Sequence, residues 1–127
     1  MALYHKQVFW PQGLLSKFEG KTWNLKFGYH AKNSCSTDRY GFIIPPMSIV
    51  FHENDVFEME TENGVVKKVV IRQPYTGKTP NNIQLDIILV IIPPDIGNIA
   101  FVKTLWFNVS TDKHYTLDRT KYSTTLK

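Results

Sequence analysis

The chain has a single cysteine, Cys35, which excludes an internal disulfide and a zinc cage built from cysteines. Its longest apolar run, Ile87–Ile92, is far shorter than the ~18 residues that a membrane-spanning helix needs. Glycine and proline number seven each, too few for a collagen-like or Pro/Gly-rich disordered chain. Residues 1–10 lack the apolar stretch of a secretory signal. We therefore expect a soluble, cytoplasmic protein of one domain, residues 1–127, with no membrane partner.

Motifs that hold nucleotides or metals are also missing. The sequence contains no GxGxxG, no Walker loop, no HExxH and no GxSxG. The four histidines, His5, His30, His52 and His114, are too scattered along the chain to suggest a metal site. A site with two histidine ligands is the remaining alternative. We predict that the protein uses no metal and no cofactor.

The charge of the chain is distributed unevenly. Fifteen Lys and Arg against eleven Asp and Glu give a net charge of +4. Five of the acidic residues lie between Glu53 and Glu62, with no basic residue among them. The rest of the chain has six acidic residues against fifteen basic ones, a balance that suits a polyanionic partner such as nucleic acid. The alternative is ordinary solvation charge.

The spacing of apolar residues in the first half predicts little regular structure. Residues 1–20 show no period and are expected to be irregular, with at most a short helix. Thr22–Tyr29 alternates polar and apolar side chains, which is typical of a half-buried strand or an extended segment. Ala31–Arg39 is polar and predicts one or two helical turns. At the other end, residues 110–127 form a polar tail without a clear period.

The second half predicts an antiparallel meander. Asp55–Thr61 alternates, and the Asn63-Gly64 pair that follows is the strongest short hairpin signal. Val65–Arg72 is rich in β-branched residues, and Leu85–Ile92 is nearly all apolar, as in a strand covered on both faces. Ile99–Val109 returns as a fourth strand. We therefore expect an α+β fold, in which a small N-terminal helical or irregular layer packs on a four-stranded antiparallel meander sheet.

Two residues at the ends of these segments are candidates for chemistry. His30 follows the first extended segment where a helix begins, and a histidine there can titrate near neutral pH and act as an acid or a base. The alternative is a surface or capping histidine. Arg72 ends the second meander strand, where its guanidinium can clamp a phosphate. The alternative is an edge-strand charge that deters aggregation.

A third candidate, Thr104, lies inside the last strand. If Phe101 and Leu105 face one way, Lys103 goes with them, and Thr104 lies on the opposite face with Val102 and Trp106. The hydroxyl of Thr104 can then donate a hydrogen bond to a phosphate oxygen. Since threonine is a good strand former, a purely structural role is the alternative.

Basic and aromatic residues mark a candidate nucleic-acid surface. Lys67 and Lys68 precede Arg72 and add a field that attracts phosphate. The tail interleaves His114 and two tyrosines with Arg and Lys, a mixture that can stack on bases and bind phosphate. The alternative for the tail is a frayed polar C-terminus. The residues expected to contact nucleic acid are Lys67, Lys68, Tyr75, Arg119, Lys121 and Tyr122.

The order of these features is the basis of a family resemblance. A histidine follows an N-terminal segment, a basic residue ends the second meander strand, a threonine lies in the last strand, and an aromatic and basic tail follows. In this order the chain resembles the barnase–EndoU–colicin–RelE group of small metal-independent ribonucleases, over about residues 23–122. The resemblance implies N-terminal helices on a four-stranded antiparallel sheet, RNA as the substrate, and a toxin or phage protein with a cognate inhibitor protein as partner.

The resemblance also implies roles for four residues. His30 and His114 would serve as base and acid, Arg72 as the charge clamp, and Thr104 as a donor to a nonbridging oxygen. The 2′-OH would attack the neighbouring phosphate and leave a 2′,3′-cyclic phosphate. Two alternatives remain open. One is a non-enzymatic nucleic-acid-binding module. The other is a protein-interaction module that uses the acidic edge Glu53–Glu62 and exposed aromatics such as Trp10.

Overall fold

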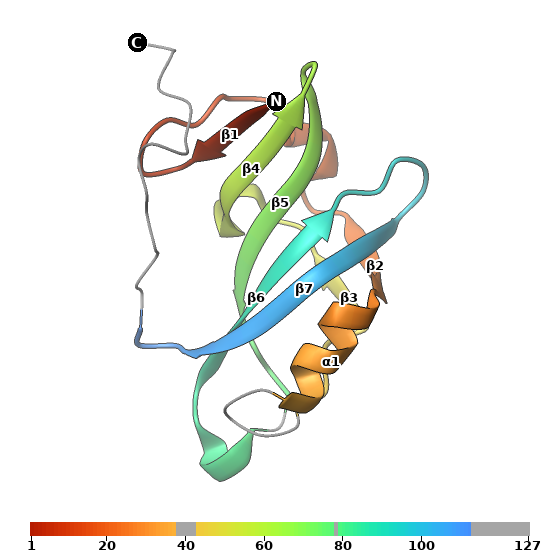
Figure 1. The fold of residues 1–127 in the computed structure, drawn as a ribbon. Helices are drawn as coiled ribbons and strands as arrows, with labels where there is room; N and C mark the ends of the chain where they lie inside the picture. The colour runs from red at the N-terminus through yellow and green to blue at the C-terminus, as the bar shows by residue number, and fades with distance from the viewer. Residues whose placement is uncertain (38–42, 78, 113–127) are drawn as a thin grey trace.

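The computed structural model describes residues 1–37, 43–77 and 79–112. It shows one seven-stranded mixed sheet with the strand order β1-β4-β5-β6-β7-β2-β3, together with one short α-helix (Figure 1). The elements in chain order are β1 (Ala2–His5), η1 (Ser16–Phe18), β2 (Thr22–Phe27), α1 (Tyr29–Thr37), β3 (Ser48–Val50), η2 (Glu53–Asp55), β4 (Val56–Glu62), β5 (Val65–Pro74), η3 (Pro80–Asn82), β6 (Leu85–Ile92) and β7 (Ile99–Val109). No helix among these residues is long and apolar enough to cross a membrane.

The meander of β4, β5, β6 and β7 forms the middle of the sheet. The predicted hairpin is confirmed, because β4 and β5 pair antiparallel on either side of Asn63 and Gly64. Both turn residues have positive φ, +52° and +76°, as a tight hairpin turn that matches the twist of the strands requires. The strands Leu85–Ile92 and Ile99–Val109 also lie where the sequence predicted them.

One face of the sheet carries the core. On β6, Leu85, Ile87, Leu89 and Ile91 are buried in a single hydrophobic cluster with apolar residues from β2, β3, β4, β5 and β7, and Tyr4 of β1 packs against it. Their partners on β5 and β7 point to the same side, since directly paired residues share a face. We call this side the inner face and the opposite side of the sheet the outer face.

The predicted four-stranded antiparallel sheet with an N-terminal helical layer is wrong. The structure adds β1 beside β4, and it adds β2 and β3 beyond β7, so the sheet has seven strands. The segment 1–20, expected to be irregular, contains β1 and the short η1. Strand β2 pairs with β7 in parallel, which makes the sheet mixed. β1 and β3 have only four and three residues, too few to show an alternation in the sequence.

Aromatic packing explains why β2 joins the sheet. Trp23 and Leu25 of β2 are buried on the inner face, while Asn24 and Lys26 are exposed. The Trp23 ring stacks on Phe51 with centroids 4.5 Å apart, and Phe18 of η1 meets both rings edge-on. These contacts bury large apolar area that the four central strands could not cover alone.

Helix α1 lies beside the part of β7 that extends beyond the end of β2 (Figure 1). Its Ala31 is fully buried in the core. The chain enters the helix at Gly28, whose N–H donates to the carbonyl of Val102 on β7. A Cβ at Gly28 would lie 2.8 Å from the ring of Phe101, so only glycine fits against that ring as it stands.

The sheet curls so that its β3 end approaches β5 across the inner face. The Gln73 amide of β5 donates to the carbonyl of Val50 in β3 at 3.1 Å and to the Asp55 carboxylate at 2.9 Å. The Tyr75 hydroxyl donates to the carbonyl of Ile44 in the segment before β3. The inner face is therefore enclosed. On the outer face, Val70 and Arg72 of β5 and Ile88 of β6 are buried as well, whereas Phe101 and Trp106 of β7 are partly exposed, so β7 is the part of this face on which a ligand can lie.

Candidate nucleic-acid interface

The outer face is described by three rows of paired residues that run across the strands. The sheet register lines up His5, Glu58, Val70, Val90 and Thr104 in one row. A second row runs from Arg72 through Ile88 to Trp106, and a third from Pro74 through Asp86 to Asn108. Arg72 and Thr104 thus share a face, on strands separated by β6.

Arg72 is held in a buried ion pair. Its Nε donates to Asp86 Oδ2 at 2.7 Å, and only 6% of each side chain is exposed. Its Nη2 donates to the backbone carbonyls of Val109 and Asp112, and Ser110 Oγ donates to the other oxygen of Asp86. These bonds fasten the end of β7 to β5 and β6. A guanidinium engaged in this way is better suited to a structural role than to clamping a phosphate.

The other predicted catalytic residues lie elsewhere or outside the described residues. His30 is exposed near the start of α1, where its ring lies 6.0 Å from that of Tyr29 and its carbonyl accepts a hydrogen bond from Ser34. Within the described residues, no hydrogen bond or ion pair joins His30 to Arg72 or Thr104. His114 lies outside the described residues.

The predicted nucleic-acid contacts are also dispersed. Lys68 forms an ion pair with Glu60 at 3.1 Å on the outer face, and Lys67 is exposed at a register shift, where Val66 pairs with Thr61 and Lys68 with Glu60. Tyr75 is half-buried, packs edge-on against Phe107 at 5.4 Å and bonds to Ile44, which are structural contacts. Arg119, Lys121 and Tyr122 lie outside the described residues.

A β-bulge in β7 changes the face on which its residues lie. Val90 pairs with Thr104 and Ile91 with Val102, so Lys103 is an extra residue between them. Val102 and Leu105 are buried on the inner face, and Lys103 is exposed. The expected alternation, in which Phe101 and Leu105 share a face, is therefore wrong. The bulge places Phe101, Thr104 and Trp106 together on the outer face.

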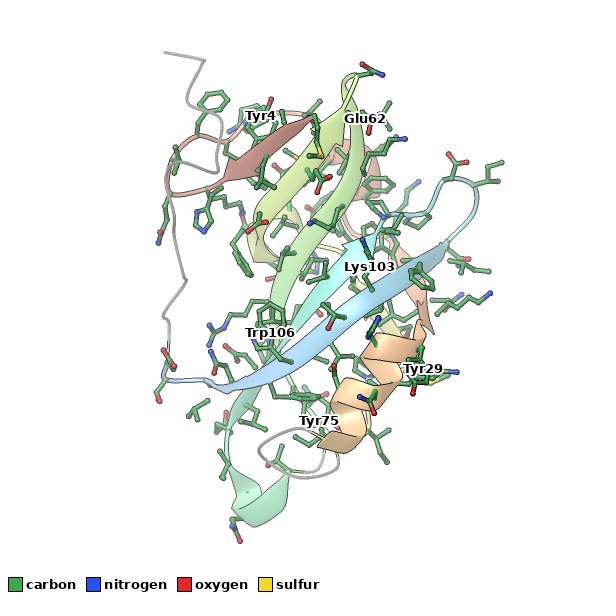
Figure 2. All side chains as sticks on the ribbon, in the orientation of Figure 1. Tyr4, Tyr29, Glu62, Tyr75, Lys103 and Trp106 are labelled. Carbon is green, nitrogen blue, oxygen red and sulfur yellow. The ribbon has the colours of Figure 1, made fainter. Side chains whose placement is uncertain are left out.

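Two large aromatic rings are exposed on this face of β7. Phe101 is 37% exposed and Trp106 is 43% exposed. Phe101 is paired with Lys26 on the neighbouring β2, and Lys103 lies between Phe101 and Trp106 along β7. Figure 2 labels Lys103 and Trp106 on this strand. We call these residues the platform: Lys26, Phe101, Lys103, Thr104 and Trp106.

The platform lies on elements that carry only positive charge. β2, α1 and β7 contain no Asp or Glu, and they contain Lys26, Lys32 and Lys103. Among the described residues, neither Lys26 nor Lys103 forms a salt bridge. Two residues of the acidic stretch lie on the far side of the same face, where Glu58 and Glu60 of β4 pair with Val70 and Lys68 of β5. The uneven charge seen in the sequence is therefore separated in space as well.

A separate polar cleft of about 360 Å³ lies beside the buried ion pair. It is lined by His5, Lys6, Phe57, Arg72, Gln73 and Asp86, among others. Burial lowers the pKa of His5, and the nearby Glu58 carboxylate raises it by less. His5 was not a sequence candidate because it lies in β1, which was expected to be irregular. Its neutral imidazole also accepts a hydrogen bond from the Gln7 backbone N–H.

The remaining observations concern metals and similar proteins. No group of three or more His, Cys, Asp or Glu that could hold a metal ion occurs within the described parts of the chain. Comparisons with models of protein families, with curated proteins and with solved structures found no match for this chain.

Proposed function

We propose that this chain binds single-stranded nucleic acid on the platform. The single observation that carries the proposal is the pair of exposed rings, Phe101 and Trp106, on one strand that also presents lysine. An unpaired base that stacks on an aromatic ring contributes about 1–3 kcal/mol, whichever base it is. The neighbouring ammonium groups attract the phosphates that connect the stacked bases.

The dimensions of the platform suit a short stretch of strand. Phe101 and Trp106 are five positions apart, which at a rise of about 3.3 Å per residue is roughly 16 Å, somewhat less across a bulge. Lys103 lies between the two rings along the strand, and Lys26 lies beside Phe101. The Thr104 hydroxyl adds a hydrogen-bond group on the same face. Several nucleotides can therefore contact the platform at once.

Metal-independent RNA cleavage stays a prediction, and we rank it below binding. The resemblance that suggested it relies on Arg72 as a charge clamp, and this residue is engaged by Asp86. Cleavage is tested by incubating labelled RNA with the parent protein and with His30→Ala. Loss of cleavage in that variant, with the fold intact, would restore catalysis as the primary function.

The binding proposal is tested by removing the rings. Phe101→Ala/Trp106→Ala is expected to weaken binding of a labelled single-stranded oligonucleotide by at least about tenfold, because each stacking contact contributes about 1–3 kcal/mol. Fluorescence anisotropy measures the affinity. Val65→Ala is the control, since Val65 is an exposed apolar residue at the distant hairpin. Equal affinity of the double variant and the parent would contradict the proposal.

A further inference from the structure

The outer face carries a second feature, the acidic residues of β4, that bears on which nucleic acid it accepts. We propose that Glu58 and Glu60 are specificity-determining residues that reject double-stranded nucleic acid. This inference rests on the proposed function, since it concerns the substrate class of the platform.

The sheet register places these carboxylates on the face that the platform occupies. Glu58 is in the same row as Thr104, with Val70 and Val90 between them. Glu60 pairs with Lys68 of β5 and holds its ammonium at 3.1 Å. β4 is three strand spacings from β7, about 14 Å along the sheet at about 4.8 Å per spacing.

A single strand and a duplex meet this face differently. A single strand has one backbone, which can follow the lysines of β7 and β2. In a duplex the second backbone lies across a groove of about 6 or 12 Å, and there is one phosphate per ~1.7 Å of axis instead of one per ~3.4 Å. With one backbone on the platform, the second reaches over β5 and β4, where it meets Glu58 and Glu60. At physiological salt, charges about 8 Å apart or closer still interact.

The β3 side of the platform offers the second backbone little charge, because Lys32 of α1 is the basic residue that the elements beside β7 add to the platform there. Beyond β2 the sheet turns inward, because Val50 of β3 is bonded to Gln73 of β5. The exposed residues there include Met47 and Val50, which are apolar and offer no charge to a phosphate. A duplex that lies across the strands is therefore expected to extend toward β4. Repulsion by the carboxylates of β4 therefore lowers the affinity for a duplex without lowering the affinity for a single strand.

The key variant is Glu60→Gln, which removes one carboxylate from the outer face and releases Lys68. The matched control is Glu62→Gln, which makes the same change in net charge at the tip of the β4–β5 hairpin (Figure 2). Each protein is titrated against a labelled single strand and against the duplex of the same sequence. Circular dichroism confirms that each variant keeps the sheet.

We expect the parent to prefer the single strand. Glu60→Gln should raise duplex affinity about three- to tenfold and change single-strand affinity less, and Glu58→Gln/Glu60→Gln should raise duplex affinity further. Glu62→Gln should leave the ratio of the two affinities near the parent value. An unchanged ratio in Glu58→Gln/Glu60→Gln, or an equal change in Glu62→Gln, would overturn this inference and leave the proposed function standing. A parent protein that binds neither ligand would overturn both.

Discussion

At the scale of single residues, Arg72 and Asp86 form the most deeply buried of the ion pairs between described residues. Moving two charges out of water is costly, and the direct bond at 2.7 Å offsets that cost together with the bonds to Val109, Ser110 and Asp112. The pair ties β5 and β6 to the end of β7. Its role as an anchor explains why an arginine occurs inside an apolar strand.

Removing one partner of this pair should destabilise the fold strongly. Asp86→Ala leaves the guanidinium buried without its carboxylate, and we expect a loss of about 3–5 kcal/mol in the free energy of unfolding. Urea denaturation followed by tryptophan fluorescence measures the change. The double variant Arg72→Met/Asp86→Leu should lose less than Asp86→Ala, since no unpaired charge is left. A loss below about 1 kcal/mol for Asp86→Ala would contradict the anchoring role.

His5 should make stability depend on pH. Burial holds its pKa below the ordinary value of 6.5, although Glu58 opposes this shift. As the pH falls from 6.5 toward the lowered pKa, the unfolded chain takes up a proton that the folded protein does not. The free energy of unfolding should therefore decrease over that window and be highest above it.

The variant His5→Gln isolates this contribution. The free energy of unfolding of parent and variant is measured at intervals between pH 7.5 and pH 5, about the range in which histidine titrates. The parent should lose more stability than the variant as the pH falls. Parallel pH profiles for the two proteins would show that the imidazole titrates alike in both states.

At the scale of elements, the junction between β2 and α1 contacts the platform through Gly28. Gly28 lies against the Phe101 ring, and its N–H bonds to Val102 of β7. The ring is partly exposed, so it can move away if the space beside it is filled. A change at this junction should therefore affect the platform more than it affects the core.

Gly28→Ala tests that connection. The new methyl group would lie 2.8 Å from the ring and should displace it, which lowers single-strand affinity about three- to tenfold through a weaker stacking contact. Because the ring is the end of a side chain and not backbone, the loss in stability should stay below about 1.5 kcal/mol. Unfolding of the variant, or an affinity equal to that of the parent, would show that Gly28 does not position Phe101.

The sequence predicted the elements that depend on local chemistry and missed those that depend on pairing between distant segments. The hairpin and the strands Leu85–Ile92 and Ile99–Val109 follow from local chemistry, namely a turn pair and long apolar runs. The parallel pairing of β2 with β7 joins segments more than 70 residues apart and has no local signal. The bulge at Lys103 is set by pairing with β6, and it reversed the expected faces of part of β7.

The sequence showed the residues of the candidate site, but their burial or exposure depends on pairing between strands that the sequence did not reveal. The sequence showed Arg72 at a strand end, but its burial depends on Asp86, on another strand. A lone carboxylate inside the apolar run Leu85–Ile92 is the signal that a buried cationic partner exists. Phe101 and Trp106 were visible as aromatic residues of a strand. Their exposure follows from the bulge, which places both rings on the outer face of β7.

At the scale of the whole molecule, the fold places the acidic stretch and the lysines of the platform on different parts of the sheet. The acidic stretch lies on η2 and β4, near one edge of the sheet, and β2, α1 and β7 carry lysines that form no salt bridge among the described residues. This asymmetry should orient a polyanion before contact and concentrate it at the platform. Binding should therefore be sensitive to salt and confined to one face.

The dependence of single-strand affinity on salt tests this account most directly. A labelled single strand is titrated by fluorescence anisotropy at several salt concentrations between about 50 and 200 mM. The parent should bind, with log affinity falling linearly against log salt. Lys26→Gln/Lys103→Gln should reduce the slope by about 1.4, or ~0.7 per phosphate contact, while Lys67→Gln, on β5 outside the platform, should leave it unchanged. No binding, binding that salt does not weaken, or an equal effect of Lys67→Gln would contradict the claim that the platform of β7 and β2 binds nucleic acid.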